Sequence, residues 1–184
     1  MAKSIRDAYG EALVTYGKND PRVVVLDADV SSSTKSATFQ KACPERFFNV
    51  GIAEANMTAM AAGFAASGKI PFANTFAVFI TSNGLTAARA FGSYSRLPIK
   101  LVGAYGGISD AFDGPSHHSL EDIAVMRALP NFKVYVASDE TMCGWLVTVS
   151  YTHLRAHETG LDLVCRLLLE KKKYETVVPA PRTT

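Results

Sequence analysis

The chain has 184 residues, of which 48% are hydrophobic and 20% charged, a composition typical of one globular domain with a sizeable core. Its net charge is only +2, and it contains no signal-peptide pattern and no apolar run long enough to span a bilayer. Its three cysteines are scattered and lack metal-ligand spacing. Together these features predict a cytoplasmic protein that binds no membrane.

Helix and strand patterns alternate along residues 1–148. We expect helices over 5–16, 54–68, 78–94 and 120–129 and from 140 onward, strands over 23–26, 47–50, 70–75, 98–105 and 133–137, and a polar loop over 31–35. Continuous apolar strands separated by helices predict an α/β fold, in which a parallel sheet carries helices on both faces.

In such sheets ligands bind beyond the carboxyl ends of the strands. Asp29, Thr75 and the glycine-rich segment 103–117 follow three different strands, so we expect them at this edge. The glycines of that segment have the spacing of neither a phosphate-binding P-loop nor a dinucleotide fingerprint.

The expected helix 54–68 is small and apolar apart from one carboxylate, Glu54, in its first turn. One interpretation is a buried carboxyl group, which needs a partner because an unpaired charge is costly in a low dielectric. The other is a solvated carboxylate stabilised by the helix macrodipole. Periodicity alone does not decide between them.

The segment 149–184 differs from the rest. Residues 149–159 and 163–173 resemble in-frame translations of the two ends of a transposon-type sequencing adapter, so we expect a domain over 1–148 and a non-native tail over 149–184. The alternative is a natural helix over 167–173. Without this segment the chain has 13 charges of each sign and no basic patch for nucleic acid, and His117 and His118 are its histidines.

The runs 49–57, 75–79 and 113–117 resemble the pyrimidine-binding domain of transketolases, and most closely the C-terminal subunit of split transketolases. The similarity covers residues 1 to about 145, in the same order. It implies a thiamine diphosphate-binding fold that is incomplete at its C-terminus. It also implies transfer of a two-carbon ketol unit between sugar phosphates. The partner would be an N-terminal subunit that carries the diphosphate and most of the Mg²⁺ contacts, in a dimer of heterodimers, and the chain alone would be inactive.

The resemblance also implies roles for individual residues. Glu54 matches the glutamic acid that hydrogen-bonds the pyrimidine ring of the cofactor, and His117 matches a residue that assists proton transfer. The remaining matches are cofactor contacts (Phe76, Phe79, Asp29) and substrate contacts (Asp113, His117, Tyr105, Ser33, Arg6), with no metal ligand from this chain.

Purely structural interpretations of the same residues stay open. Phe76 and Phe79 have the spacing of ordinary core residues, Ser33 suits a turn or helix cap, and Arg6 suits a solvated surface. Tyr105 stands where many transketolases have a histidine, which leaves the exact substrate open. Related thiamine-dependent enzymes (deoxyxylulose-phosphate synthase, the beta subunits of 2-oxo-acid dehydrogenases) are alternatives, as is a non-catalytic interaction domain or inactive fragment.

Overall fold

The computed structural model describes residues 3–152 and 162–167. Its strands are β1 Val23–Asp27, β2 Phe47–Asn49, β3 Ile70–Phe76, β4 Lys100–Ala104, β5 Phe132–Ala137 and β6 Asp162–Leu167. Its helices are α1 Ile5–Asn19, α2 Ser31–Thr34, α3 Ala37–Ala42, α4 Glu54–Ala66, α5 Ala77–Ser82, α6 Leu85–Ala87, α7 Asp122–Arg127 and α8 Glu140–Thr152. The single-turn or irregular helices are η1 Pro44–Arg46, η2 Ala88–Tyr94 and η3 Pro115–His117.

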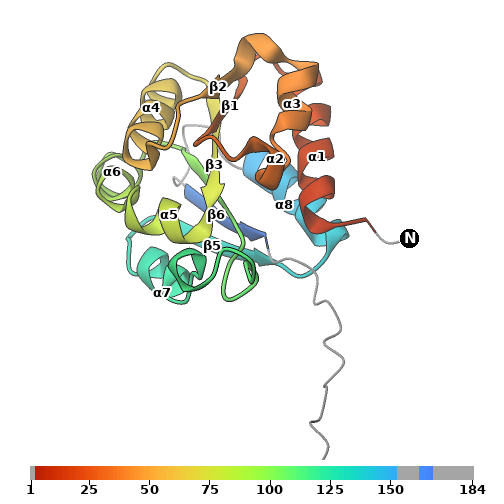
Figure 1. The fold of residues 1–184 in the computed structure, drawn as a ribbon. Helices are drawn as coiled ribbons and strands as arrows, with labels where there is room; N and C mark the ends of the chain where they lie inside the picture. Colours follow the sequence, from red (N-terminus) through yellow and green to blue (C-terminus); the bar gives the residue numbers. More distant parts are fainter. Residues whose placement is uncertain (1–2, 153–161, 168–184) are drawn as a thin grey trace, which may run out of the picture.

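The strands form one sheet in the order β2-β1-β3-β4-β6-β5, and every pairing is parallel. Helices α1, α3 and α8 cover one face, and α4 to α7 cover the other (Figure 1). Each face has its own core: Leu13 and Phe39 are fully buried on the first, and Met57 and Met126 on the second. The predicted fold class, a parallel α/β sheet covered on both faces, is confirmed.

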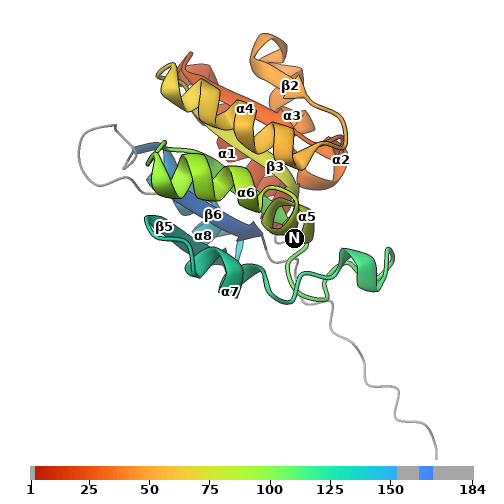
Figure 2. The same ribbon diagram turned by 90° about the vertical axis from the view of Figure 1, so that its left-hand side faces the viewer.

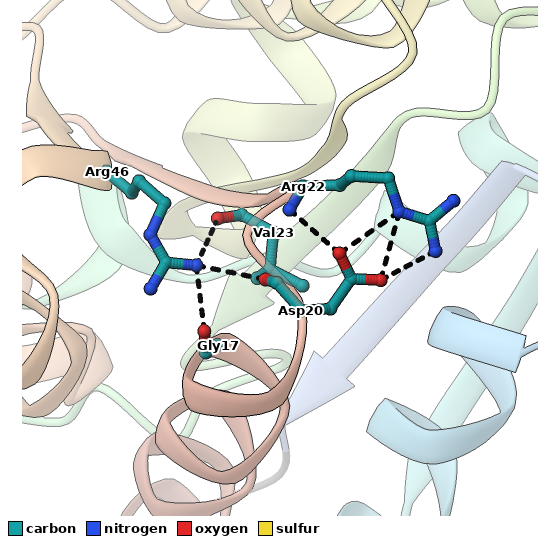
Figure 3. A network of polar contacts seen from close by, with 5 residues as sticks. All are labelled: Gly17, Asp20, Arg22, Val23 and Arg46. Carbon is teal, nitrogen blue, oxygen red and sulfur yellow. Dashed lines mark hydrogen bonds and ion pairs between the residues drawn. The ribbon is translucent and has the colours of Figure 1, made fainter.

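Polar groups close both ends of α1. At its start the Ser4 side chain accepts a hydrogen bond from the backbone N–H of Asp7. At its end, Arg46 donates from Nη1 to the carbonyl oxygens of Gly17 at 2.8 Å and Asp20 at 2.9 Å (Figure 3). Arg22 forms an ion pair with the Asp20 carboxylate on the other side of this turn. The guanidinium groups therefore fix the connection between α1 and β1.

Two local predictions were wrong. The expected polar loop over 31–35 contains the short helix α2, because a buried carboxylate, Asp27, accepts hydrogen bonds that close this turn. The single helix expected over 78–94 is instead α5, α6 and the π-helical turn η2. The interruption falls at Asn83 and Gly84, a dipeptide that favours a turn.

Helix α4 is buried on one face only, although its residues are small and mostly apolar. Its buried residues, among them Glu54, Met57 and Ala61, form one face toward the sheet. Ala55 and Gly63 are exposed. Alanine and glycine carry too little surface to show which face of a helix points inward, so the sequence pattern does not identify the buried face.

Two parts of the segment 149–184, which we interpreted as a non-native tail, lie in the helices and strands of the structure. Helix α8 continues to Thr152, and β6 lies between β4 and β5, where it is paired with both. The run 163–165 (Leu-Val-Cys) is apolar, as an interior parallel strand requires. The adapter origin of residues 149–184 stays a prediction, and the alternative helix over 167–173 lies almost entirely outside the described residues.

Among the described residues, no helix is both long and apolar enough to cross a bilayer.

Candidate functional site

The carboxyl ends of the parallel strands meet at one edge of the sheet. Helix α2, which follows β1, and the long loop 105–121, which follows β4, project toward the same side of the molecule, on the right in Figure 2. Helix α5 starts directly after β3 at this edge, with Phe76 as its N-cap. The fold therefore brings residues from distant parts of the chain to one place, as predicted for parallel sheets.

Four ring side chains, Phe76, Phe79, Tyr105 and His117, pack together there and form what we call the aromatic cluster. The ring centroids of Phe76 and Phe79 lie 6.0 Å apart in a stacked arrangement. The His117 ring meets them edge-on, at 5.1 Å from Phe79 and 5.8 Å from Phe76, and Tyr105 meets Phe76 at 4.9 Å. Phe76 is buried, whereas Phe79 and His117 are only half-buried. The cluster thus leaves part of its aromatic surface open to a ligand.

Arg6 joins the aromatic cluster from helix α1. Its Nη1 atom donates to the Tyr105 hydroxyl at 2.6 Å and to the Ser33 carbonyl at 2.7 Å. The guanidinium carbon lies 4.9 Å from the centre of the Tyr105 ring, a cation–π geometry. Its Nε atom is buried and has no hydrogen-bond partner among the described residues. Arg6 is therefore a half-buried, positioned cation, and its interpretation as a free surface arginine was wrong.

Glu54 is buried, with 5% of its surface exposed, which decides between the two interpretations of the sequence. Asn83 donates from Nδ2 to Glu54 Oε2 at 3.2 Å. The backbone N–H of Asn83 in turn donates to the Phe79 carbonyl at 2.9 Å. Asn83 thus connects the carboxyl group in the first turn of α4 with the helical turn that carries the aromatic cluster.

Two of the predicted site residues have an unusual backbone. Asp29 and Tyr105 adopt positive φ angles of 66° and 58°. This conformation is uncommon for any residue except glycine, and for a bulky side chain such as tyrosine it is a true outlier. Strained backbones concentrate at functional sites, where surrounding contacts hold them in place. Asn49 holds Asp29 through a hydrogen bond of 2.8 Å to its carboxylate.

The loop that carries Asp113 is closed at its base. Gly107 and Ser119 form an antiparallel bridge with backbone hydrogen bonds of 2.8 and 2.9 Å. Asp113 itself is exposed. His118 points back into the loop, where its Nε2 atom lies 3.1 Å from the Asp110 carbonyl oxygen. The two neighbouring histidines of this loop therefore lie in different surroundings: His117 contacts the aromatic cluster, and His118 contacts the backbone of the loop.

The structure brings six of the predicted residues into one connected group: Arg6, Ser33, Phe76, Phe79, Tyr105 and His117. Glu54 is connected to them through Asn83, which the sequence did not single out. Asp29 and Asp113 lie in loops at the same edge, and Asp29 accepts a hydrogen bond from Asn49.

Asp27 is a second polar residue that the sequence did not single out. It is completely buried at the end of β1 and accepts hydrogen bonds from the Val30 backbone and from the hydroxyl groups of Thr34 and Ser36. Burial raises the pKa of Asp27, although these hydrogen bonds act in the opposite direction. Because the carboxyl group holds α2 in place, it positions the Ser33 carbonyl that Arg6 contacts. The available signal was an aspartate between an apolar strand and a run of serines.

Within residues 3–150, where side chains are described, no three His, Cys, Asp or Glu side chains gather in a way that could hold a metal ion.

Comparison with known proteins agrees with this geometry. The model of the transketolase pyrimidine-binding domain matches residues 1–155. A transketolase C-terminal section from Methanocaldococcus jannaschii is 47% identical over 137 residues, which are 74% of this chain and 43% of that protein. A 6-deoxy-6-sulfo-D-fructose transketolase subunit from Clostridium sp. (strain MSTE9) is 35% identical over 84% of this chain and 47% of its own length. The chain thus spans less than half the length of these curated relatives.

Solved structures give the same result. A split-gene transketolase, described as an inactive beta4 tetramer, superposes with a TM-score of 0.76 at 41% identity, over 91% of this chain and 52% of that one. Transketolase from Leishmania mexicana has a TM-score of 0.78 at 26% identity, over 91% of this chain and 26% of that one.

Proposed function

Because this chain belongs to the family of transketolase pyrimidine-binding domains, we propose that it forms the pyrimidine-binding half of a thiamine diphosphate-dependent transketolase. With an N-terminal partner subunit it would transfer a two-carbon ketol unit between sugar phosphates. The observation that carries this proposal is the buried carboxyl group of Glu54, which Asn83 holds in the first turn of α4 and connects to the aromatic cluster.

The residues at the edge of the sheet fit the cofactor. A carboxyl group that is buried and hydrogen-bonded can share a proton with a ring nitrogen, which a solvated carboxylate does poorly. The half-buried face of Phe79, stacked with Phe76, offers a flat apolar surface to an aminopyrimidine ring. When bound, thiamine diphosphate supplies a nucleophilic carbon on its thiazolium ring. Glu54 would hold the proton at the pyrimidine nitrogen, and Phe76 and Phe79 would orient the ring.

The remaining predicted residues fit a sugar phosphate. Arg6 has its guanidinium held by Tyr105 and by the Ser33 carbonyl, which leaves N–H groups for a phosphate. His117 lies within the aromatic cluster and would move protons at the substrate hydroxyl groups. Asp113 and Asp29, on the neighbouring loops, would bind further hydroxyl groups.

The partner subunit would supply the diphosphate site and the Mg²⁺ ligands. Two relatives are named as a C-terminal section and as a split-gene transketolase, names that suggest a second polypeptide. Large apolar side chains near the site are strongly exposed, among them Phe112 at 97% and Ile52 at 83%. Exposed apolar groups of this size are typical of surfaces that bind another protein. We propose a dimer of such heterodimers as the assembly, in the cytoplasm.

The test is reconstitution. The chain is assayed for ketol transfer alone and with an N-terminal transketolase subunit, in the presence of thiamine diphosphate, Mg²⁺, a ketose phosphate and an aldose phosphate. We expect turnover only with the partner. A 2-oxo acid and a sulfonated ketose are tested as alternative donors, the latter because one relative is named for such a substrate. Turnover by the isolated chain would contradict a site completed by two subunits.

Glu54→Gln tests catalysis against a scaffold role. Glutamine keeps the size of the side chain but cannot share a proton, so we expect kcat of the reconstituted complex to fall by about 100-fold or more. Size-exclusion chromatography should show an intact complex. Glu121→Gln, at an exposed position before α7, is the matched control and should behave as the unmodified chain does. Full activity of the Glu54→Gln complex would favour a non-catalytic interaction domain.

A further inference from the structure

Helix α2 is too short to be stable by itself. It has four residues, and a single helical turn fixes more backbone angles than its few hydrogen bonds stabilise. Its N-cap residue, Val30, makes no capping hydrogen bond with its side chain. Lys35, which ends the helix, has a positive φ angle of 65°, an unfavourable conformation for a residue with a long side chain. Contacts from outside α2 must therefore hold it in place.

The side chain of Asp27 makes such contacts along the whole length of α2. Its Oδ1 atom accepts a hydrogen bond of 2.7 Å from the Val30 backbone N–H. Its Oδ2 atom accepts hydrogen bonds of 2.8 Å from the hydroxyl groups of Thr34 and Ser36. Burying a carboxyl group completely, as at Asp27, is costly unless hydrogen bonds compensate. An apolar side chain would avoid this cost but could not hold α2.

Helix α2 in turn holds Arg6. The carbonyl groups at the end of a helix have no partner within it, and the Ser33 carbonyl accepts a hydrogen bond of 2.7 Å from Arg6 Nη1. The same nitrogen donates to the Tyr105 hydroxyl at 2.6 Å. Its two acceptors belong to α2 and to the loop after β4, which lie far apart in the sequence. The guanidinium keeps this orientation only while α2 stays in place.

A second observation, independent of Asp27, places α1 directly against the end of α2. Gly10 lies one turn after Arg6 on α1 and is buried. A Cβ atom at Gly10 would lie 2.7 Å from the Lys35 carbonyl oxygen and 3.2 Å from the Thr38 hydroxyl. Only glycine allows so close an approach. The distance between α1 and α2, and with it the reach of Arg6 to Ser33, is therefore fixed by this contact.

We propose that Asp27 is a positioning residue: through α2 it holds the Arg6 guanidinium in the orientation that binds the phosphate group of a sugar phosphate. The orientation of Arg6 follows from the contacts above, whereas the binding of phosphate rests on the proposed function. Loosening α2 should therefore weaken binding of the phosphate group and leave the chemistry at the two-carbon end unchanged. A residue that only stabilised the fold would show no such preference.

The orientation of Arg6 is tested by NMR, without activity. A guanidinium held by two acceptors rotates slowly, so its two Nη groups should give separate signals, which Arg6→Lys identifies. Thr34→Val/Ser36→Ala leaves the buried Oδ2 atom without a donor, so α2 should shift and the two signals should merge. Ser150→Ala, which removes a buried hydroxyl group near the end of α8, is the matched control and should keep them separate. Separate signals in the double variant, or merged signals in the unmodified chain, would overturn the proposal.

Gly10→Ala displaces α2 without changing Asp27 or its partners. The added methyl group overpacks the contact between α1 and α2, so the Arg6 signals should merge here too. Gly63→Ala adds a methyl group where no atom lies within 4 Å and should leave the signals separate. If Gly10→Ala folds and keeps the signals separate, α2 does not set the orientation of Arg6.

The consequence for the substrate is tested in the reconstituted complex with two donors, a ketose phosphate and the same ketose without its phosphate. Thr34→Val/Ser36→Ala should raise KM for the ketose phosphate about tenfold, while kcat changes less than about threefold. KM for the unphosphorylated ketose should change less than about twofold. In an Arg6→Ala background the double substitution should have no further effect on KM, because Asp27 acts through Arg6.

These measurements separate the positioning role from the proposed function. Equal losses with both donors, no loss with the ketose phosphate, or an undiminished effect in the Arg6→Ala background would overturn the role in phosphate binding. If the unmodified complex lacks ketol transfer, the proposed function fails. The NMR series still decides whether Asp27 orients Arg6.

Discussion

His117 and His118 are adjacent in the chain, but their rings lie in different surroundings. The His117 ring packs edge-on against Phe79 at 5.1 Å, within the aromatic cluster. The His118 ring lies 3.1 Å from the backbone of Asp110, inside the loop. Only His117 is placed beside the surface where we propose that the cofactor and the sugar bind, so the pair offers a natural comparison of a proton-transfer role with a loop-supporting role.

We expect His117→Ala to lower kcat/KM of the reconstituted complex by about 100-fold or more, because general acid–base catalysis contributes at least this much. His118→Ala should lower kcat/KM by less than about threefold and act mainly on thermal stability. Steady-state kinetics with one ketose phosphate donor and circular-dichroism melting curves measure both effects. Equal losses in the two variants would mean that the loop as a whole, rather than His117, is required.

Several of the site residues that the sequence predicted lie in a contiguous family motif, such as Glu54 in 49–57 and Phe79 in 75–79. Asn83 and Asp27 were not predicted, because their importance comes from hydrogen bonds that only the folded structure shows. Asn83 reaches a residue 29 positions away, on another helix. An asparagine before a glycine indicates a turn. Nothing in the local sequence pattern predicts its hydrogen bond to a buried carboxyl group.

At the level of secondary structure, the segment expected as one helix over 78–94 shows where pattern and packing disagree. The spacing of its apolar residues is helical throughout, and each piece of the observed chain is indeed helical. The chain breaks at Gly84 because α5 and α4 approach each other closely there. A Cβ atom at Gly84 would lie 2.5 Å from the Ile80 carbonyl oxygen and 2.8 Å from the Thr58 hydroxyl. Such an approach cannot be read from hydrophobic periodicity.

Two glycine substitutions test this account. Gly84→Ala should lower the free energy of unfolding by about 1–3 kcal/mol, since the added methyl group overpacks a buried contact. Gly63→Ala, on the exposed side of α4, meets no atom within 4 Å and should raise it by about 0.5–1 kcal/mol. Urea unfolding of the 184-residue chain measures both. A neutral or stabilising Gly84→Ala would show that α4 and α5 can move apart freely at this point.

For the whole molecule, the sheet depends on a strand from the segment whose origin is in question. The order β4-β6-β5 means that β6 alone connects β5 to the rest of the sheet. It pairs with β4 over five residue pairs and with β5 over six. The sequence predicted this fold class without β6, because the alternation of helices and strands over 1–148 already specifies a parallel sheet. It did not predict which residues complete the sheet, since residues 163–167 were interpreted by their resemblance to an adapter.

Removal of β6 tests whether this segment contributes to the folded sheet. A chain ending at residue 152 loses an interior strand and its backbone hydrogen bonds to both neighbours, each worth about 0.5–1.5 kcal/mol net. We expect its Tm to fall by roughly 10 °C or more, or cooperative unfolding to be lost.

A chain ending at residue 167 keeps β6 and is the matched control, whose Tm should agree with that of the full chain. Calorimetry and binding of an apolar dye would report the exposed faces of β4 and β5 in the shorter chain. If the chain ending at 152 melts at the same temperature as the control, β6 contributes nothing to the fold, and the segment behaves as an appended tail would. If it melts lower, residues 162–167 are part of the folded sheet, whatever DNA encodes them.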